Sequence, residues 1–234
     1  INVPPGFMKS LLTNVFWPAW EWGPMDKAHL RYVTFSYSAS LTERDNRRFG
    51  DLVTCAEYVR LYGDRVKIVK LGERLVSNSK KGGKLATSVG GGGTGERGDR
   101  IILDDPHNVK EAESDTVRQE TVRWLRESMS SRLNDMRSGC IVIIMQRVHE
   151  EDVSGSILSL GLNYHHLMIP MEFEPDRCQE TVIGWIDPRY DEGDPDGCAG
   201  ELAWPERFPA DVCETMKRDA GPYAWAGQYQ QSPA

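Results

Sequence analysis

The sequence predicts an α/β domain whose mainly parallel central sheet is flanked by helices. Residues 101–103 and 140–145 are continuous apolar runs, as expected for strands that are buried on both faces of a sheet. Segments with apolar residues at helical spacing alternate with segments rich in β-branched and aromatic residues. This alternation favours parallel pairing, because parallel strands need a long crossover connection.

The first part of the chain predicts a strand end, a turn and a helix. Residues 1–3 predict the tail of a strand, and Pro-Pro-Gly at residues 4–6 predicts a turn. We expect a helix to begin near Lys9 and to end before Pro18, because proline inside a helix removes a hydrogen bond.

A strand, a helix and a short strand are expected next. Residues 32–35 are β-branched or aromatic and predict a strand. Ser40 and Glu43 have the spacing of a capping box, which indicates a helix N-terminus. Residues 49–59 carry apolar side chains at helical spacing, and residues 66–69 predict a short strand.

The second half contains one irregular segment and three further helices. Residues 82–98 hold eight glycines, which are too many for a regular element. Short helices are expected near residues 207–219 and 222–230. A long helix before residue 140 is expected to carry one apolar stripe, formed by Val122, Leu125, Met129, Leu133 and Met136.

The composition argues against a membrane-spanning or a disulfide-rich protein. No uninterrupted apolar stretch approaches the roughly 20 residues that a helix needs to cross a bilayer. The chain has 5 cysteines and no Cys-x-x-Cys pair, which argues against a disulfide framework or a zinc ribbon. We therefore expect a reducing, cytoplasmic compartment.

The charges are distributed unevenly along a chain with a net charge of −7. Residues 171–234 carry 14 acidic and 5 basic side chains, and residues 1–170 carry 21 acidic and 23 basic ones. This contrast predicts a core domain at 1–170 and an acidic part at 171–234. Any contact with nucleic acid should be local, because constitutive duplex binding usually needs a basic face. The one concentrated basic segment, which could equally be a solvated surface, comprises Arg65, Lys67, Lys70, Arg74, Lys80, Lys81 and Lys84.

A phosphate-binding loop is one interpretation of residues 4–10, Pro-Pro-Gly-Phe-Met-Lys-Ser. Backbone N–H groups at a helix start favour an anion, Lys9 adds a charge, and Ser10 could place its hydroxyl on Mg²⁺. The usual pattern has glycine where this chain has Val3 and Met8. An ordinary turn is therefore the alternative.

Asp104 and Asp105 follow the apolar run at 101–103. A carboxylate at the end of a buried strand can hold a metal, and a neighbouring one can activate water. Alternation would point the two side chains to opposite faces, so one must leave the regular strand path. The alternative is an acidic turn before Pro106.

Polar residues also follow the apolar run at 140–145. Gln146 could sense the γ-phosphate from the neighbouring strand. In the alternative, a metal site for hydrolysis would be built from Asp104, Asp105, His107, His149 and Asp152. Acidic residues at the start of a helix more often serve as caps.

The glycine-rich segment at residues 90–98 is either a flexible linker or a mobile loop. In the second case, Arg97 or Arg100 could act as an arginine finger on a phosphate, which increases the rate by about 10³- to 10⁵-fold.

Taken in their order and spacing, these motifs resemble the large terminase subunit of tailed bacteriophages. The resemblance covers nearly the whole chain and falls on the ATPase half of that family. Its members form ring motors on the capsid portal and hydrolyse ATP to drive double-stranded DNA into the prohead. The motifs that carry it are Pro-Pro-Gly-Phe-Met-Lys-Ser at 4–10, Tyr37-Ser38 with Arg44, Arg47 and Arg48, Gly-Glu-Arg-Gly-Asp-Arg at 95–100 running into 101–106, Glu-Ala-Glu-Ser at 111–114, residues 146–155, and Gln-Tyr-Gln-Gln-Ser-Pro at 228–233.

The resemblance implies a P-loop NTPase fold of the additional-strand (ASCE) type with ATP and Mg²⁺ as cofactors. Ser10 and Asp104 would hold the metal. Asp105 would activate water, Arg97 would act on a neighbour's nucleotide, and Gln146 would couple hydrolysis to movement. The residues implied to bind the nucleotide are Pro5, Gly6, Phe7, Met8, Lys9, Ser10 and Leu11.

The resemblance also implies partners and a location. The partners are double-stranded DNA, gripped through its phosphate backbone without sequence preference, the portal protein, the small terminase subunit and further copies of this chain in a ring. No membrane is implied, and the location is the host cell cytoplasm.

The chain departs from the family pattern at three positions. Met8 stands where relatives have glycine, Asp105 where many have glutamate, and Gln146 where they have threonine. Because the chain begins without an initiator methionine, we expect a piece of a longer protein, with a truncated first strand and the nuclease domain beyond its last residue.

A helicase or another additional-strand ATPase, which would lack the Gln-Tyr-Gln-Gln-Ser-Pro ending, is the nearest alternative in mechanism. Two functions of other classes also stay open. One is a metal-dependent nuclease that uses Asp104, Asp105 and His107. The other is a non-catalytic module that docks the portal or the small terminase through the acidic region after residue 170.

Overall fold

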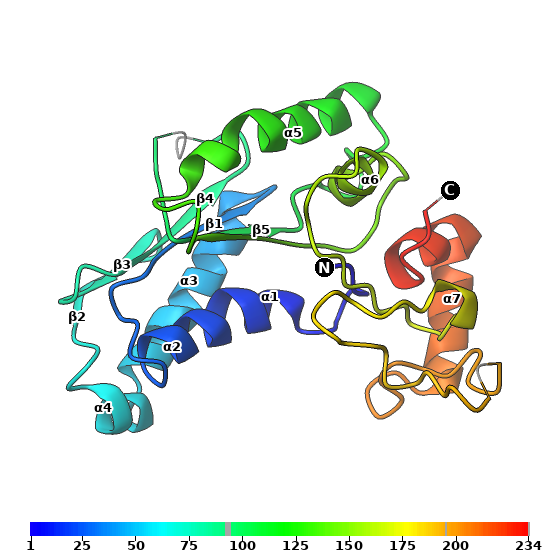
Figure 1. Ribbon diagram of the computed structural model, residues 1–234, viewed down its shortest axis with the longest axis horizontal. Helices are drawn as coiled ribbons and strands as arrows, with labels where there is room; N and C mark the ends of the chain where they lie inside the picture. Colours follow the sequence, from blue (N-terminus) through cyan, green and yellow to red (C-terminus); the bar gives the residue numbers. More distant parts are fainter. Residues whose placement is uncertain (92–94, 195, 234) are drawn as a thin grey trace. The chain divides into compact units, whose positions relative to one another are not determined.

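The computed structural model describes residues 1–91, 95–194 and 196–233, and the chain divides into two compact units (Figure 1). Met8–Ile144 form one unit, called here the sheet unit. Ile1–Phe7 together with Met145–Ala234 form the other, called the terminal unit. The sequence predicts a change of character after residue 170, whereas the contacts divide the chain at Met145.

A six-stranded, mostly parallel sheet forms the centre of the sheet unit, with the order β2-β3-β4-β1-β5-β6. Strands β4, β1, β5 and β6 are parallel neighbours, and β2-β3-β4 are antiparallel. The strands are β1 (Arg31–Ser36), β2 (Ile68–Leu71), β3 (Leu75–Asn78), β4 (Gly83–Ser88), β5 (Arg100–Asp104) and β6 (Cys140–Ile144). The predicted α/β class with a mainly parallel sheet flanked by helices is therefore confirmed.

Helices cover both faces of this sheet. Figure 1 shows α5 on one face and α1, α2 and α3 on the other. The helices of the unit are α1 (Lys9–Leu11), the π-helix η1 (Leu12–Phe16), α2 (Trp17–Trp22), α3 (Ala39–Thr54), α4 (Ala56–Tyr62), α5 (Asp115–Ser128) and the 3-10 helix η2 (Ser130–Arg132).

The core of the sheet unit follows the alternation of β1. Tyr32 packs in the cluster formed with Trp22 and Phe49, whereas Phe35 meets Trp124 of α5 with the ring centroids 5.1 Å apart. Residues an odd number apart on a strand point to opposite faces. The strand therefore joins two apolar layers.

Several predicted boundaries are wrong, each for a local reason. The first helix does not end before Pro18, because the π-helix η1 leads into α2, whose second residue is this proline. Ser40 is not a cap, since α3 begins after Ser38. The helix before β6 ends at Ser128, which leaves Met136 67% exposed.

The sheet also differs from the prediction at its two ends. The glycine-rich stretch was expected to be irregular, but β4 begins within it at Gly83 and pairs with β1. Gly92, Gly93 and Thr94 of that stretch lie outside the described residues. Strand β6 ends the sheet order, and its first three residues are only half-buried, so it is not buried along its whole length.

The terminal unit contains little regular structure. Its helices are α6 (Val153–Ser159), the 3-10 helix η3 (Pro175–Arg177), α7 (Ala210–Ala224) and the π-helix η4 (Trp225–Tyr229). Asn2 forms parallel bridges with both Met145 and Met168. The two helices predicted after residue 206 correspond to the parts of α7 before and after the non-helical Gly221, and the second part continues into η4. Within the described residues, no helix is long and apolar enough to cross a membrane.

Candidate active site

Lys9 begins α1 and lies next to a residue with left-handed backbone. Met8 has φ 56°, a conformation that costs most residues energy and costs glycine almost nothing. This requirement explains physically why glycine suits the position before the lysine. The Met8 side chain is 43% exposed, whereas Lys9 is 8% exposed. Lys9 Nζ forms an ion pair with Asp105 Oδ2 at 3.1 Å.

The end of β5 separates two neighbouring carboxylates. Asp104 is the last residue of the strand and is 5% exposed. Asp105 has φ 43°, so the chain turns out of the strand path there, as alternation requires if both carboxylates are to lie at one site. The Asp105 N–H donates to the Ile144 carbonyl at 2.9 Å, and the Asp105 carbonyl accepts from the Tyr37 N–H at 3.2 Å.

Asn14, which the sequence analysis missed, contacts Asp104 directly. Its Nδ2 donates to Asp104 Oδ2 at 2.7 Å, and Asn14 is fully buried. Burial, followed by repulsion from Asp105, raises the pKa of Asp104 to about 7, while a hydrogen bond from Ser10 and the charge of Lys9 act in the opposite direction. The feature of the sequence that could have identified Asn14 is its polar amide, which follows Ser10 by four residues among mostly apolar helix residues.

The same residues fit a hard divalent cation. Among the described residues, Asp104 Oδ1 and Asn14 Oδ1 are buried and have no hydrogen-bond partner. A buried acceptor without a donor is costly, and Mg²⁺ prefers carboxylate, carbonyl and hydroxyl oxygens. Ser10, bonded to Asp104, would add a hydroxyl. The donor set therefore suits Mg²⁺.

Four residues that were predicted to bind the nucleotide have contacts outside the site of Lys9, Asp104 and Asp105. Pro5, Gly6 and Phe7 belong to the terminal unit. There the Phe7 ring stacks on Phe208 with the centroids 5.4 Å apart. Leu11 packs against the apolar core of the sheet unit.

The two candidate arginines differ in what they contact. Arg97 is exposed and donates from Nε to the Ser131 carbonyl at 3.2 Å. Arg100 forms an ion pair with the buried Glu21 at 2.8 Å. Glu21 also accepts a short hydrogen bond from Tyr32. Arg100 therefore has a structural function, as the ion-pair partner of the buried Glu21. Arg97 is exposed and is the better candidate for contact with a second molecule.

Gln146 precedes a buried ion pair in the terminal unit. Arg147 Nε lies 2.9 Å from Asp152 Oδ2, and Asp152 caps α6 by accepting from the Gly155 N–H at 2.8 Å. His149 Nδ1 accepts from the Glu151 N–H at 3.1 Å. Among the described residues, no group of three or more His, Cys, Asp or Glu side chains could hold a metal ion.

Two glutamines near the end of the chain, Gln230 and Gln231, form hydrogen bonds with other residues of the terminal unit, including Arg147. Gln231 Oε1 accepts from the Arg147 N–H at 3.0 Å, and Gln230 accepts from the Glu172 N–H at 2.8 Å. Arg177 donates to the carbonyls of both glutamines at 2.8 and 3.0 Å. These hydrogen bonds give Gln230 and Gln231 a structural function.

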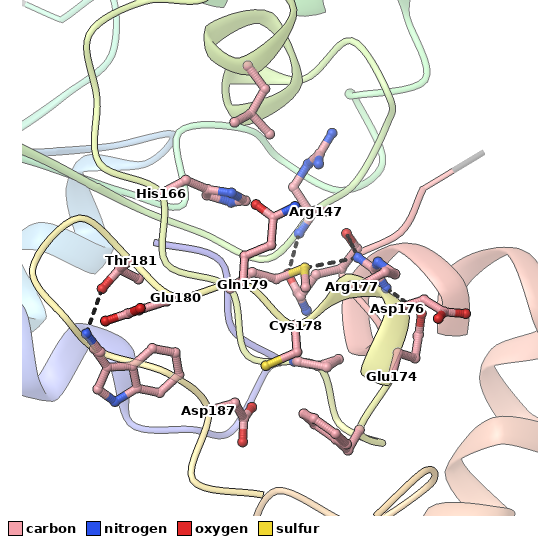
Figure 2. A pocket seen from close by; sticks show the side chains of 16 residues that line it. Arg147, His166, Glu174, Asp176, Arg177, Cys178, Gln179, Glu180, Thr181 and Asp187 are labelled. Atoms are coloured by element: carbon pink, nitrogen blue, oxygen red, sulfur yellow. Dashed lines mark hydrogen bonds and ion pairs between the residues drawn. The ribbon is translucent and has the colours of Figure 1, made fainter. Parts of the chain in front are cut away.

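A cavity of about 330 Å³ lies beside these contacts (Figure 2). Arg147 and Arg177 line it together with Glu174, Cys178 and Asp187. Arg147 is paired with Asp152, and Arg177 with Glu174. The positive charges of this cavity are therefore already compensated by carboxylates within the unit.

Comparisons with known proteins assign no family. No family model matches this chain, and no curated protein does.

The basic segment is mostly exposed, with one exception. Arg65, Lys67, Lys70, Arg74, Lys80 and Lys81 are exposed. Lys84 is fully buried, and its Nζ donates to Asn46 Oδ1 at 3.1 Å. Lys84 cannot reach a DNA phosphate from this position. Its inclusion in the predicted basic surface is therefore wrong.

Replacing Lys84 with methionine is expected to remove a pH dependence of stability. Burial lowers the pKa of Lys84 from 10.5 to about 8, so between these values the unfolded chain binds more protons than the folded one. The free energy of unfolding of the natural chain, relative to Lys84→Met, should therefore rise by about 2 kcal/mol between pH 7 and pH 10. Urea unfolding of both proteins across this range measures it. A constant difference would contradict the burial of a charged Lys84.

Proposed function

We propose that this chain is an ATP-hydrolysing motor module of the terminase type, with a P-loop NTPase fold, that drives movement of double-stranded DNA. The observation that carries the proposal is the meeting of Lys9 with Asp104 and Asp105 where β5 ends and α1 begins. A cation at a helix start and carboxylates at a strand end are the groups that a metal-bound triphosphate requires.

The residues have separate tasks in this proposal. Bound Mg-ATP would supply the phosphoryl group and a metal charge that stabilises the phosphates. Lys9 Nζ would bind phosphate oxygens, and Ser10 and Asp104 would hold the metal. Asp105 would orient the attacking water and accept its proton. Gln146 would carry the response to hydrolysis into the chain before α6.

A pairing in the structure supports a link between binding and catalysis. Lys9 and Asp105 neutralise each other at 3.1 Å. A phosphate would compete with Asp105 for Lys9, because its oxygens carry more negative charge. Phosphate binding would thereby release the Asp105 carboxylate next to the reacting phosphoryl group.

The proposed partners follow from exposed cations and from the resemblance. The six exposed side chains of the basic segment would grip phosphates without reading the sequence. The exposed Arg97 would act on the nucleotide of a neighbouring copy in a ring. The portal protein and the small terminase subunit are the further partners that we propose.

ATP turnover of the 234-residue chain tests the proposal. We expect Mg²⁺-dependent phosphate release that falls more than about 100-fold in Lys9→Ala and in Asp104→Asn. Lys110→Ala and Asp51→Asn make the same chemical changes at exposed sites of the sheet unit and should retain full turnover.

Two other results would redirect the assignment. A folded chain that binds no nucleotide would favour the non-catalytic docking module. Cleavage of plasmid DNA with Mn²⁺ that is lost in Asp104→Ala would favour the nuclease.

A further inference from the structure

Asn14 lies in an unusual helical turn directly after Ser10. Residues Leu12–Phe16 form the π-helix η1, whose wider turn changes the direction in which its side chains point. Such turns are rare and frequently occur at functional sites. Asn14 is fully buried here, among neighbours on the helix that pack in the apolar core, such as Val15 and Ala19.

Asn14 and Asp104 each use one polar atom in the hydrogen bond between them, and one oxygen of each side chain takes no part in it. Asn14 Nδ2 donates to Asp104 Oδ2 at 2.7 Å. Among the described residues, Asn14 Oδ1 and Asp104 Oδ1 have no hydrogen-bond partner, although both atoms are buried. Buried oxygens are nearly always paired, so two unpaired acceptors on bonded side chains indicate a missing positive partner.

We propose that Asn14 is a positioning residue for a divalent-cation site formed with Asp104. Its amide N–H group fixes the carboxylate orientation, so that Oδ1 is kept for the cation. Its own carbonyl oxygen supplies a further acceptor for the ion or for its water. This inference deepens the proposed function, because the cation is the one that would accompany the nucleotide, and it rests on that function for its biological meaning.

The chemistry of asparagine explains why this residue suits the position. An amide offers donors and an acceptor without adding a charge, whereas an aspartate would repel Asp104. A leucine of similar size would remove the amide donor to Asp104 Oδ2, whereas the hydrogen bond from Ser10 would stay. Outer partners that orient a metal ligand typically change metal affinity about 10- to 100-fold when they are removed.

Direct Mn²⁺ binding tests the inference without relying on catalysis. Mn²⁺ is titrated into the 234-residue chain without nucleotide, and the free ion is followed by electron paramagnetic resonance. We expect binding that is lost in Asp104→Asn and about 10- to 100-fold weaker in Asn14→Leu and Asn14→Ser. Thermal unfolding of each variant establishes that it is folded, and the serine variant covers the case in which leucine prevents folding.

Thr13→Ala provides a matched control in the same turn. The Thr13 hydroxyl donates to the Lys9 carbonyl at 3.0 Å, so its removal costs a hydrogen bond of the helix. We expect this variant to bind Mn²⁺ like the natural chain. Equal weakening in Thr13→Ala and Asn14→Ser would reduce Asn14 to a structural residue and overturn the inference.

Two further readouts separate this inference from the proposed function. ATP binding in EDTA depends on Lys9 and should be retained in the Asn14 variants, since they leave Lys9 in place. Mn²⁺ binding that needs Asp104 and Asn14 in a chain that binds no ATP would support the inference and refute the proposed function. Absence of Asp104-dependent Mn²⁺ binding, or unchanged affinity in both Asn14 variants, would overturn the inference.

Discussion

Asp105→Asn is expected to abolish ATP turnover while it tightens nucleotide binding. The carboxylate is the proposed base, and removal of a general base costs about 10²- to 10⁴-fold in rate. The same carboxylate pairs with Lys9 at 3.1 Å, so its neutralisation frees the lysine for phosphate. Phosphate release measures the first effect, and titration with a fluorescent ATP analogue measures the second.

Asp105→Glu is the control for this prediction. The substitution keeps the negative charge and lengthens the side chain by one methylene. We expect it to retain turnover within about tenfold, since a carboxylate stays in reach of the water. Full turnover in Asp105→Asn would remove Asp105 from the reaction, while Asp104 would keep its proposed role of holding the metal.

Asp152→Ala is expected to destabilise the terminal unit by about 3–5 kcal/mol. The substitution leaves the buried Arg147 without its counter-ion, and an uncompensated buried charge is among the costliest changes in a protein. It also removes the cap of α6 and the acceptor of the Val148 N–H at 3.0 Å. Hydrogen exchange of the α6 amides should accelerate accordingly, and the urea midpoint should fall.

Glu150→Ala is the matched control, because this neighbouring carboxylate is exposed. Its loss should change the free energy of unfolding by less than about 0.5 kcal/mol. Similar exchange rates in Asp152→Ala and Glu150→Ala would show that Arg147 does not depend on Asp152 for its charge balance.

Strands with a purely apolar signal were predictable. The run before Asp104 and the run at 140–145 became β5 and β6, because apolar strands flanked by turn residues have few alternatives. The antiparallel β2-β3-β4 ribbon was missed in part, since Lys84 and Gly83 mimic a loop. There, Lys84 lies over the Phe49 ring at 5.5 Å and reaches Asn46, contacts that come only from tertiary packing.

The candidate site was predictable where motifs occupy element ends. Lys9 and Asp105 were expected at one site and form an ion pair. Asn14 was missed because its contact with Asp104 depends on the π-helix. A single sequence gives no sign of such a turn. Arg100 was a second candidate for catalysis, but its partner Glu21 is 79 residues away in the sequence, so spacing could not reveal the pairing.

The π-helix η1 makes the spacing between the site and the core intolerant of length changes. A π turn holds one more residue than an α turn, so deleting a residue between Leu12 and Phe16 would let the segment wind as an ordinary α-helix. Each residue in a helix turns the chain by about 100°. Lys9 and Ser10 would then rotate away from Asp104 and Asp105 while Trp22 stayed anchored. A substitution in this turn alters one side chain, but a change of a single codon in length would redirect the whole start of the helix.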